Sequence, residues 1–356
     1  MRVLITGCAG FIGSHLLDSL LARDNVEVIG WDPDARRIAH LHDHPRLTFR
    51  QQRVDGQAIP VQLRADMATV DWVVNLSAIC NPSLYNTEAL RTIHANLFEA
   101  YPIVEMAAQL GKRLVHFSTS EVYGRTLASY LPEGLRDDPD LYMLDADHTP
   151  LIMGPIRNQR WTYATAKQMV ERLVYAHHVE NGLEFAIVRP FNFFGPRMDY
   201  LPGIEGSGLP RVLPMFLAAM LKGEPMQLVD GGHARRTITS IHDAIDALMA
   251  ILDRPERSLG HIYNIGNPAN EVTMRDLAQA MRRAFVRVTG ETRFAFHPIE
   301  EVASAQFYGP GYEDSDRRIM DISGESARLD WHPHRDLDSL LDETVGYYWT
   351  RYGLAA

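Results

Sequence analysis

The sequence contains only two cysteines, Cys8 and Cys80, among 356 residues. Two cysteines cannot build a disulfide framework, so the chain suits a reducing compartment. It also lacks an apolar run long enough to span a bilayer, and it begins directly with a strand-like segment, so we expect neither a membrane span nor a signal peptide. These absences predict a cytoplasmic protein that acts away from membranes.

Basic residues are in the minority: 35 Lys and Arg stand against 45 Asp and Glu, which gives a formal net charge of −10. That balance argues against nucleic acid as a general partner. An anionic small molecule can still bind where arginines gather locally. The length exceeds one ordinary α/β core, so we expect two lobes.

Three glycines follow the first expected strand, residues 2–6, and precede an amphipathic run over residues 14–23. Strand, glycine-rich turn and helix form the context of a dinucleotide-binding fingerprint. The glycines allow a tight turn and a close approach to pyrophosphate, and the helix N-terminus supplies N–H groups and a positive dipole. The spacing is GxxGxxG, and the candidate cofactor contacts are Gly7, Gly10, Phe11, Ile12 and Gly13.

A second expected strand, residues 27–32, ends in Asp32, about 20 residues past the glycines. A carboxylate there accepts hydrogen bonds from ribose hydroxyls and repels a 2′-phosphate, which favours NAD over NADP. Arg36 and Arg37 follow closely and leave NADP open, since arginine can hold a 2′-phosphate. Further candidate cofactor contacts are Asp55, Leu76 and Ala78.

Small hydroxyl side chains and an acid, Ser118–Glu121, follow an expected strand that begins at Arg113. They therefore lie at the carboxyl edge of the sheet, where open α/β sheets bind ligands. Tyr163 and Lys167 are four residues apart in a helical run to His177, which places them on one helix face. A nearby ammonium favours the phenolate and lowers the tyrosine pKa, so we predict that Tyr163 is a catalytic base.

The stretch 189–197, Arg-Pro-Phe-Asn-Phe-Phe-Gly-Pro-Arg, separates this cofactor-binding part from a substrate-binding part. The apolar run 185–189 reads as a buried strand, so Asn192 lies just past its carboxyl end and is a candidate substrate contact. Arg235 and Arg236 follow two glycines and suit bidentate contact with a pyrophosphate. We expect no metal site. The histidines judged to lack partner acids at metal-ligand spacing are His177, His178, His332 and His334.

Together these residues resemble the extended short-chain dehydrogenase/reductase family, whose cofactor loop, catalytic hydroxyls and Tyr/Lys pair match GCAGFIG, Ser118–Ser120 and YATAK. Within that family the chain resembles UDP-glucuronate decarboxylases, among them the plant UDP-apiose/UDP-xylose synthases and the decarboxylase domain of the bifunctional polymyxin-resistance enzyme. The segments that carry this resemblance are HFSTSEVYG, GPIRNQRWTYATAKQ, GLEFAIVRPFNFFGPRMD, LVDGGHARRTIT, YNIGNPANEVT and FYGPGYEDSDRR. They cover nearly the whole chain.

The resemblance implies an enzyme that uses NAD to oxidise C4 of UDP-glucuronate and then decarboxylates the 4-keto intermediate. Tyr163, assisted by Lys167 and by the hydroxyl of Thr119 or Ser120, takes the proton from the 4-hydroxyl. The products implied are a UDP-4-ketopentose and UDP-pentoses such as UDP-xylose or UDP-apiose.

The same resemblance implies that Glu121 and Arg318 act around C5 and the substrate carboxylate. This agrees with their chemistry, because arginine stays charged and can hold a carboxylate or a developing oxyanion. Substrate contacts are implied for Cys80, Tyr85, Arg160, Asn192, Arg236 and Tyr312. Arg211 and Arg235 are further candidate substrate contacts.

Two positions bear on the product. The apiose synthases have a cysteine where Ser120 stands, and that thiol is implicated in ring contraction, so Ser120 favours the ketopentose or UDP-xylose. Cys80 matches those synthases and leaves apiose open, although a buried cysteine also serves as a small hydrophobe. Two rival functions remain: a nucleotide-sugar 4-epimerase or dehydratase of the same fold, and a non-catalytic NAD(H)-binding protein that acts through partners.

The expected fold is α/β, a Rossmann-like doubly wound parallel sheet with a smaller C-terminal substrate-binding lobe. We expect the NAD-binding domain over residues 1–191 plus about 240–266, and the nucleotide-sugar lobe over about 192–239 plus 267–356. The resemblance also suggests a homodimer that forms through helices over residues 90–109 and 163–177.

Overall fold

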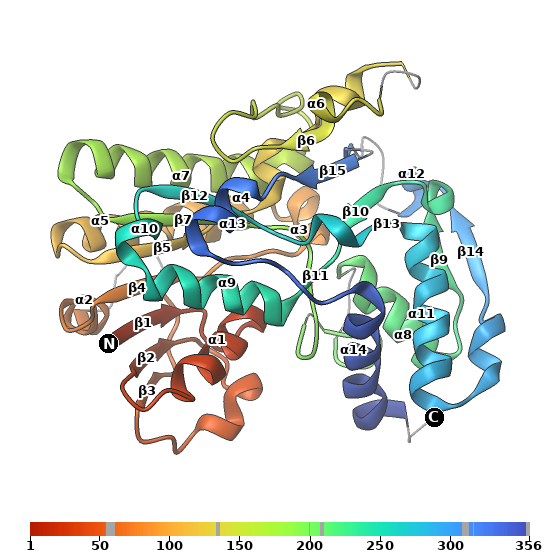
Figure 1. Cartoon of the computed structure of the whole chain (residues 1–356), viewed down its shortest axis with the longest axis horizontal. Helices are drawn as coiled ribbons and strands as arrows, with labels where there is room; N and C mark the ends of the chain where they lie inside the picture. Colours follow the sequence, from red (N-terminus) through yellow and green to blue (C-terminus); the bar gives the residue numbers. More distant parts are fainter. Residues whose placement is uncertain are drawn as a thin grey trace.

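A computed structural model describes residues 1–54, 61–132, 136–198, 200–206, 210–307, 313–315 and 317–353. At the centre of this described part is a seven-stranded sheet with the order β12-β7-β5-β4-β1-β2-β3, and its neighbouring strands are parallel (Figure 1). Its strands are β1 (Arg2–Thr6), β2 (Glu27–Trp31), β3 (Leu47–Arg50), β4 (Trp72–Asn75), β5 (Arg113–Phe117), β7 (Phe185–Pro190) and β12 (His261–Ile265). The strand order reverses between β1 and β4, which confirms the expected doubly wound sheet and marks its ligand-binding crevice.

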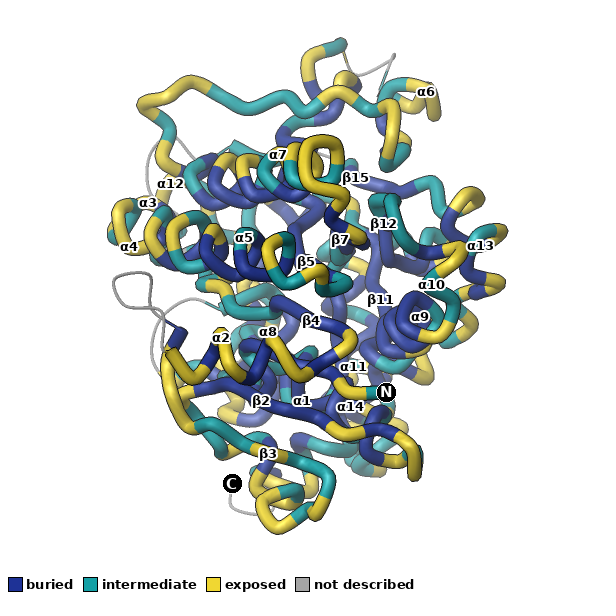
Figure 2. Tube along the Cα trace, turned by 90° about the vertical axis from the view of Figure 1, so that its left-hand side faces the viewer, coloured by how far each residue is buried: buried dark blue, intermediate teal, exposed yellow. Residues whose placement is uncertain are grey.

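Helices cover both faces of this sheet, so its strands are apolar throughout rather than alternating. In β1, Val3 and Ile5 pack in one apolar cluster with helices α1 (Phe11–Leu21) and α9 (Ile241–Asp253). Leu4 points to the opposite face and packs in a second cluster. The helices of that second face are α2 (Val61–Ala68), α5 (Tyr101–Gln109) and α7 (Thr162–Asn181). Figure 2 shows the central strands as buried and the outer helix faces as exposed.

A third apolar cluster joins α8 (Val212–Lys222), α11 (Met274–Thr289) and α14 (Leu337–Tyr352) beside the main sheet (Figure 1). The sequence predicts helices over residues 211–223, 274–288 and 337–352, and the structure confirms each to within one residue at either end. Capping explains the bounds of α11: the Thr273 side chain accepts from the Asp276 N–H, and Gly290 ends the helix at φ 75°. A short parallel pair, β9 (Met226–Val229) and β14 (Ile299–Val302), lies against these helices.

A small sheet of order β13-β10-β15-β6 collects segments from distant parts of the chain. Its strands are β6 (Met143–Leu144), β10 (Arg235–Thr237), β13 (Glu271–Thr273) and β15 (Arg317–Met320). The parallel register of β10 and β15 places Arg235 opposite Arg317 and Arg236 opposite Arg318. This pairing therefore brings Arg236 and Arg318, which are far apart in the sequence, directly beside each other.

Some expected elements differ in extent. The apolar run over residues 72–80 predicts one strand, but the strand ends at Asn75, because its neighbour β1 ends at Thr6 and the chain then turns at Gly7 with φ 71°. The helix expected over residues 90–109 is interrupted by a π-turn, His94–Phe98. The polar stretch over residues 137–158 predicts a loop, but it contains a short helix as well as β6.

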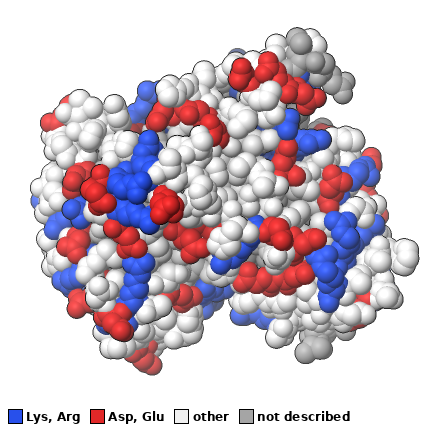
Figure 3. Space-filling model, viewed as in Figure 1, with Lys and Arg blue, Asp and Glu red and all other residues white. Residues whose placement is uncertain are grey.

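The remaining elements are short. The helices are α3 (Pro82–Thr87), α4 (Ala89–Ile93), α6 (Pro139–Tyr142), α10 (Pro255–Ser258), α12 (Ser304–Phe307) and α13 (Ser323–Leu329), and the strands are β8 (Phe193–Phe194) and β11 (Thr239–Ser240). Within the described residues, no helix is both long enough and apolar enough to cross a bilayer. Acidic and basic side chains are interspersed on the face shown in Figure 3.

Candidate active site

One cavity of about 1320 Å³ runs from the glycine-rich turn to the arginines of the small sheet. That volume exceeds a typical single-ligand pocket of about 300–1,000 Å³, so it suits a cofactor and a substrate together. Most candidate residues from the sequence line it: Gly7, Gly10, Phe11, Ile12, Gly13, Leu76, Ala78, Cys80, Tyr85, Thr119, Ser120, Glu121, Arg160, Tyr163, Lys167, Asn192, Arg211, Arg236 and Arg318. Asp55 and Tyr312 lie outside the described residues.

The glycine turn has the geometry that a dinucleotide needs. Gly7 has φ 71°, a conformation that side chains with a Cβ rarely adopt. A Cβ on Gly13 would stand 2.4 Å from the Gly7 carbonyl oxygen, so only glycine permits this close packing. Gly10 caps α1 without a side chain, which leaves the helix N-terminus open to the cavity. These residues fit a bound pyrophosphate.

Asp32 lies at the end of β2, beside the glycine turn. Its carboxylate accepts hydrogen bonds from the Ala9 N–H at 3.0 Å and the Asp34 N–H at 2.9 Å. Burial raises the pKa of Asp32, while these two hydrogen bonds act in the opposite direction. Its neighbours Arg36 and Arg37 are both engaged elsewhere. Arg36 pairs with Asp34, and Arg37 donates to the Arg197 carbonyl at 3.0 Å.

Tyr163 and Lys167 occupy the same face of α7, as the sequence predicts. The Tyr163 hydroxyl lies 3.2 Å from Cys80 Sγ and also forms a hydrogen bond with Thr119. The Lys167 ammonium donates to the Phe117 carbonyl at the end of β5, at 2.9 Å. Between the two candidate hydroxyls, the structure therefore places Thr119 rather than Ser120 against the tyrosine.

The electrostatics of this pair differ from the expected lowering of the tyrosine pKa. Burial raises the pKa of Tyr163 well above its usual range, and the nearby Cys80 and Glu121 act in the same direction. Burial also lowers the pKa of Lys167, whose ammonium is held by a backbone carbonyl rather than by the phenol. In the protein alone, desolvation thus outweighs the effect of the ammonium.

Three further candidates form part of the walls of the cavity. The Tyr85 ring stacks on the Tyr163 ring, with centroids 4.8 Å apart and planes 9° apart, which holds the reactive ring in place. Asn192 adopts φ 45°, a left-handed conformation that asparagine tolerates, and its side chain donates to the Thr237 carbonyl at 2.9 Å. Arg211 lies over the Phe11 ring at 5.9 Å.

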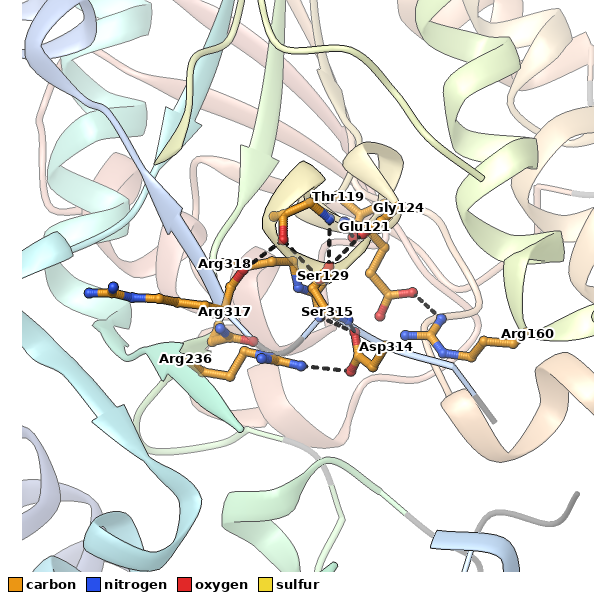
Figure 4. Close-up of polar contacts among 12 residues, drawn as sticks. Thr119, Glu121, Gly124, Ser129, Arg160, Arg236, Asp314, Ser315, Arg317 and Arg318 are labelled. Carbon is orange, nitrogen blue, oxygen red and sulfur yellow. Dashed lines mark hydrogen bonds and ion pairs between the residues drawn. The ribbon is translucent and has the colours of Figure 1, made fainter. Parts of the chain in front are cut away.

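Ion pairs dominate the end of the cavity away from the glycine turn. Arg160, which is 5% exposed, donates to the Glu121 carboxylate at 2.6 Å. Glu121 thus pairs with Arg160, although Arg318 is near enough to interact with it electrostatically. Figure 4 shows Arg160 pointing toward Glu121, with their contact drawn as a dashed line.

Arg236 and Arg318 share a carboxylate, Asp314, that the sequence did not single out. Asp314 lies 2.8 Å from Arg236 and 3.1 Å from Arg318, and Arg236 points toward it in Figure 4. Burial would raise the pKa of Asp314, but the guanidinium groups of Arg236 and Arg318 hold it well below its usual range. The segment FYGPGYEDSDRR contains Asp314, yet nothing in its spacing indicates which arginines it meets.

The structure places Arg235 and His334 differently from what the sequence predicts. Side chains alternate along a strand, so Arg235 and Arg317 face away from Arg236 and Arg318, and both pair with Glu271. Arg235 is not brought to the cavity. His334 lies 3.2 Å from Asp243, with Asp246 close by, because folding brings α9 beside residue 334. Arg335 already pairs with that Asp243 carboxylate at 2.7 Å.

Comparison with known families agrees with this arrangement. The model of the NAD dependent epimerase/dehydratase family matches residues 3–266, which include the glycine turn, Tyr163 and the strands of the main sheet. The chain belongs to this family.

Several individual proteins and solved structures are similar to this chain over nearly its whole length. A UDP-D-apiose/UDP-D-xylose synthase of Arabidopsis thaliana is 46% identical over 363 residues, covering 100% of this chain and 93% of the relative. The enzyme of that name from Oryza sativa is 44% identical over 362 residues, covering 99% and 90%. The crystal structure of the PbgP3 protein from Burkholderia pseudomallei is 32% identical with a TM-score of 0.83, covering 99% and 98%. A UDP-glucuronic acid 4-epimerase of Bacillus cereus, solved with NAD, shares the fold at 21% identity and a TM-score of 0.76, covering 99% of this chain and 100% of that one.

Proposed function

We propose that this protein is an NAD-dependent UDP-glucuronate decarboxylase that works through a 4-keto intermediate. The observation that carries the proposal is the single cavity, which joins a dinucleotide-binding turn and Tyr163 to a cluster of arginines. The relatives named as UDP-apiose/UDP-xylose synthases, at 44–46% identity over the whole chain, support it. Bound NAD⁺ would rest on the glycine turn and Asp32 and would accept a hydride from C4.

The residues around C4 handle a proton. The phenolate form of Tyr163 takes the proton of the 4-hydroxyl as the hydride departs, and the Thr119 hydroxyl stabilises that phenolate by its hydrogen bond to Tyr163. Lys167 supplies positive charge nearby and is positioned by the Phe117 carbonyl. Burial favours the protonated phenol of Tyr163 in the protein alone. When ligands are bound, nearby positive charge therefore has to assist the loss of this phenol proton before Tyr163 can act as a base.

The residues around C5 handle the carboxylate. A 4-keto group makes the C6 carboxylate a β-keto acid, so the C5–C6 bond breaks with its electron pair moving into an enolate at C4. Arg318 positions the carboxylate and can also stabilise the enolate oxygen that gains the negative charge, because a guanidinium stays protonated even when buried. Glu121, held by Arg160, lies on the same side of the cavity and can return a proton to C5 through water or its own carboxyl group.

The rival functions are less well supported. An epimerase or dehydratase of this fold also needs Tyr163, and an epimerase that acts on a uronate needs a group that holds the carboxylate as well. What favours the decarboxylase over these two is the 44–46% identity of the whole chain to UDP-apiose/UDP-xylose synthases. A non-catalytic NAD(H)-binding protein needs neither Tyr163 nor Lys167 in a cavity with Glu121. The division into an NAD-binding domain and a nucleotide-sugar lobe, with its boundaries near residues 191, 240 and 266, remains part of this proposal.

Incubation with UDP-glucuronate and NAD⁺ tests the function directly. We expect loss of CO₂ and formation of a UDP-4-ketopentose, UDP-xylose or both, detected by mass spectrometry and NMR of the sugar nucleotides. Ser120 also lines the cavity, where a hydroxyl is a much weaker acid than a thiol of pKa about 8.5. UDP-apiose should therefore be minor, and a parallel Ser120→Cys arm should raise its share. Recovery of the C4 epimer of UDP-glucuronate as the only product would favour an epimerase instead.

Asp32 leads to a prediction on cofactor choice. NAD⁺ should bind at least tenfold more tightly than NADP⁺, because a 2′-phosphate would meet the Asp32 carboxylate and each tenfold is about 1.4 kcal/mol. Calorimetric titration of both cofactors measures the ratio. Asp32→Asn should reduce it, whereas Asp34→Asn, which removes the partner of Arg36, should change it less. Equal binding of both cofactors to the wild type would contradict the assignment.

We also propose a homodimer through α7 and the helices beside it. Apolar side chains are exposed there: Tyr175 by 56% and Val179 by 66%, one turn apart on α7, and Phe98 by 53% on the adjoining π-turn. Light scattering should therefore give twice the mass of the 40.2 kDa chain, and Tyr175→Asp should shift the protein toward monomer. Phe296→Asp, at an apolar residue 85% exposed in the other lobe, should leave the dimer unchanged. A wild-type monomer at micromolar concentration would rule this assembly out.

A further inference from the structure

An internal carboxylate occupies the arginine pair at the substrate end of the cavity. Asp314 lies 2.8 Å from Arg236 and 3.1 Å from Arg318, and all three side chains line the cavity. The two arginines are cross-strand neighbours, so one carboxylate reaches both of them. A carboxylate held by guanidinium groups is also the contact that the C6 group of a uronate needs.

Three arginines gather at this end of the cavity. Arg160 pairs with Glu121, and Arg236 and Arg318 both pair with Asp314. Because guanidinium groups stay charged, they suit a substrate carboxylate better than a neutral sugar group.

Arg318 carries an unused donor. Its side chain is 8% exposed, one Nη donates to Asp314, and its Nε has no hydrogen-bond partner among the described residues. A buried donor without an acceptor is unfavourable, so a ligand that supplies an acceptor would be favoured here. Arg236 instead directs its second Nη to the Arg235 carbonyl at 2.6 Å. A substrate carboxylate that binds side-on to Nε and Nη2, as carboxylates bind bidentately to guanidinium groups, would take the Nη2 that Asp314 now holds. The geometry therefore favours Arg318 as the group that exchanges partners.

Building on the proposed decarboxylase function, we propose that Asp314 competes with the substrate carboxylate for Arg318 and so limits how tightly the uronate is held. This weak hold has a chemical use. As the C5–C6 bond breaks, negative charge leaves the carboxylate for the enolate, and the carboxyl group departs as neutral CO₂. A tight contact to the carboxylate would stabilise the bound substrate more than the transition state and would slow the step. Asp314 is thus a positioning residue that acts through Arg318 and weakens the binding of the substrate carboxylate by this arginine.

The test is Asp314→Asn, which keeps the shape of the side chain and removes its charge. Binding is measured by calorimetry on the NAD⁺-loaded protein in a Tyr163→Phe background, where substrate is not turned over. We expect UDP-glucuronate to bind about tenfold more tightly, as for the gain of one charge-assisted hydrogen bond. UDP and UDP-glucose, which lack the carboxylate, should change by less than about twofold. With Tyr163 intact, KM and kcat should fall together.

Glu171→Gln is the matched control. Glu171 pairs with Arg189 at 2.7 Å, and that ion pair is more buried than the Asp314 cluster but does not line the cavity. Removing its charge should lower the melting temperature and leave the affinity for UDP-glucuronate within about twofold. Asp314→Glu, which keeps the charge, should also leave the affinity within about threefold.

A second measurement does not depend on any substitution at Asp314. A crystal structure of the Tyr163→Phe protein with NAD⁺ and UDP-glucuronate should show the C6 carboxylate on Arg318 and Asp314 released from it. Unchanged or weaker UDP-glucuronate binding by Asp314→Asn, or an intact Arg318–Asp314 pair in that complex, would overturn the proposal. If the parent protein neither turns over UDP-glucuronate nor binds it better than UDP, the proposed function itself fails, which the same titrations reveal.

Discussion

Tyr163→Phe should abolish most turnover of UDP-glucuronate while leaving UDP binding nearly intact. The substitution removes only the hydroxyl that accepts the proton from the 4-hydroxyl, and general acid–base assistance is worth about 10²–10⁴-fold. The phenylalanine ring can still stack on Tyr85, so the shape of the cavity is kept. The measurement is the rate of NADH formation and of product release, with UDP affinity determined in parallel.

Tyr85→Phe is the matched control for that experiment. It removes a hydroxyl from the ring stacked directly on Tyr163, in the same cavity, but not the hydroxyl that meets Cys80 and Thr119. We expect a loss of less than about tenfold, as for one hydrogen bond to substrate. A Tyr163→Phe protein that keeps turnover within threefold of wild type would refute the role of Tyr163 as the base.

Arg318→Met should separate oxidation from decarboxylation. Methionine fills much of the same buried space but carries no charge, so the C6 carboxylate and the developing enolate lose their guanidinium. Removal of a donor aimed at developing negative charge costs about 10²–10³-fold in rate. Oxidation at C4 depends on Tyr163, which meets Cys80 and Thr119 rather than Arg318, and should be affected less. Rapid-quench mass spectrometry should therefore detect a UDP-4-keto-hexuronate, and the absorbance of NADH should build up.

Arg317→Met provides the control beside it. Arg317 precedes Arg318 in β15, but its side chain faces the opposite side of the strand and pairs with Glu271 at 2.7 Å. Its loss should change decarboxylation by less than about threefold, because it touches neither the cavity nor Asp314. Equal losses in both variants would mean that Arg318 acts through folding of the small sheet rather than through the substrate.

The cofactor end of the site was predictable from the sequence because its geometry is local. Gly7, Gly10 and Gly13 lie within one turn that joins a strand to a helix, and the close packing of Gly13 on Gly7 is set by neighbours in the chain. Tyr163 and Lys167 are one helical turn apart, so their shared face follows from the helix alone. The resemblance to known families added the substrate and the candidate roles of Glu121 and Arg318.

Other features were decided only by tertiary structure. Nothing local shows that Arg37 turns toward the Arg197 carbonyl, away from a possible 2′-phosphate. Burial by neighbouring elements sets the pKa of Tyr163 above its usual range, against the expectation from Lys167 alone. Glu121 meets Arg160 because the turn after β5 and the turn before α7 come together at one edge of the sheet.

The sequence by itself determined the doubly wound sheet, the glycine turn and the Tyr163–Lys167 pair, since each depends on residues a few positions apart with a clear period. Only the tertiary structure decided which arginine of each adjacent pair faces the cavity. The strands β10 and β15 have three and four residues, too few for a period to be read, and their register is set by pairing between distant segments. That pairing places Arg236 and Arg318 together on Asp314 and turns Arg235 and Arg317 toward Glu271.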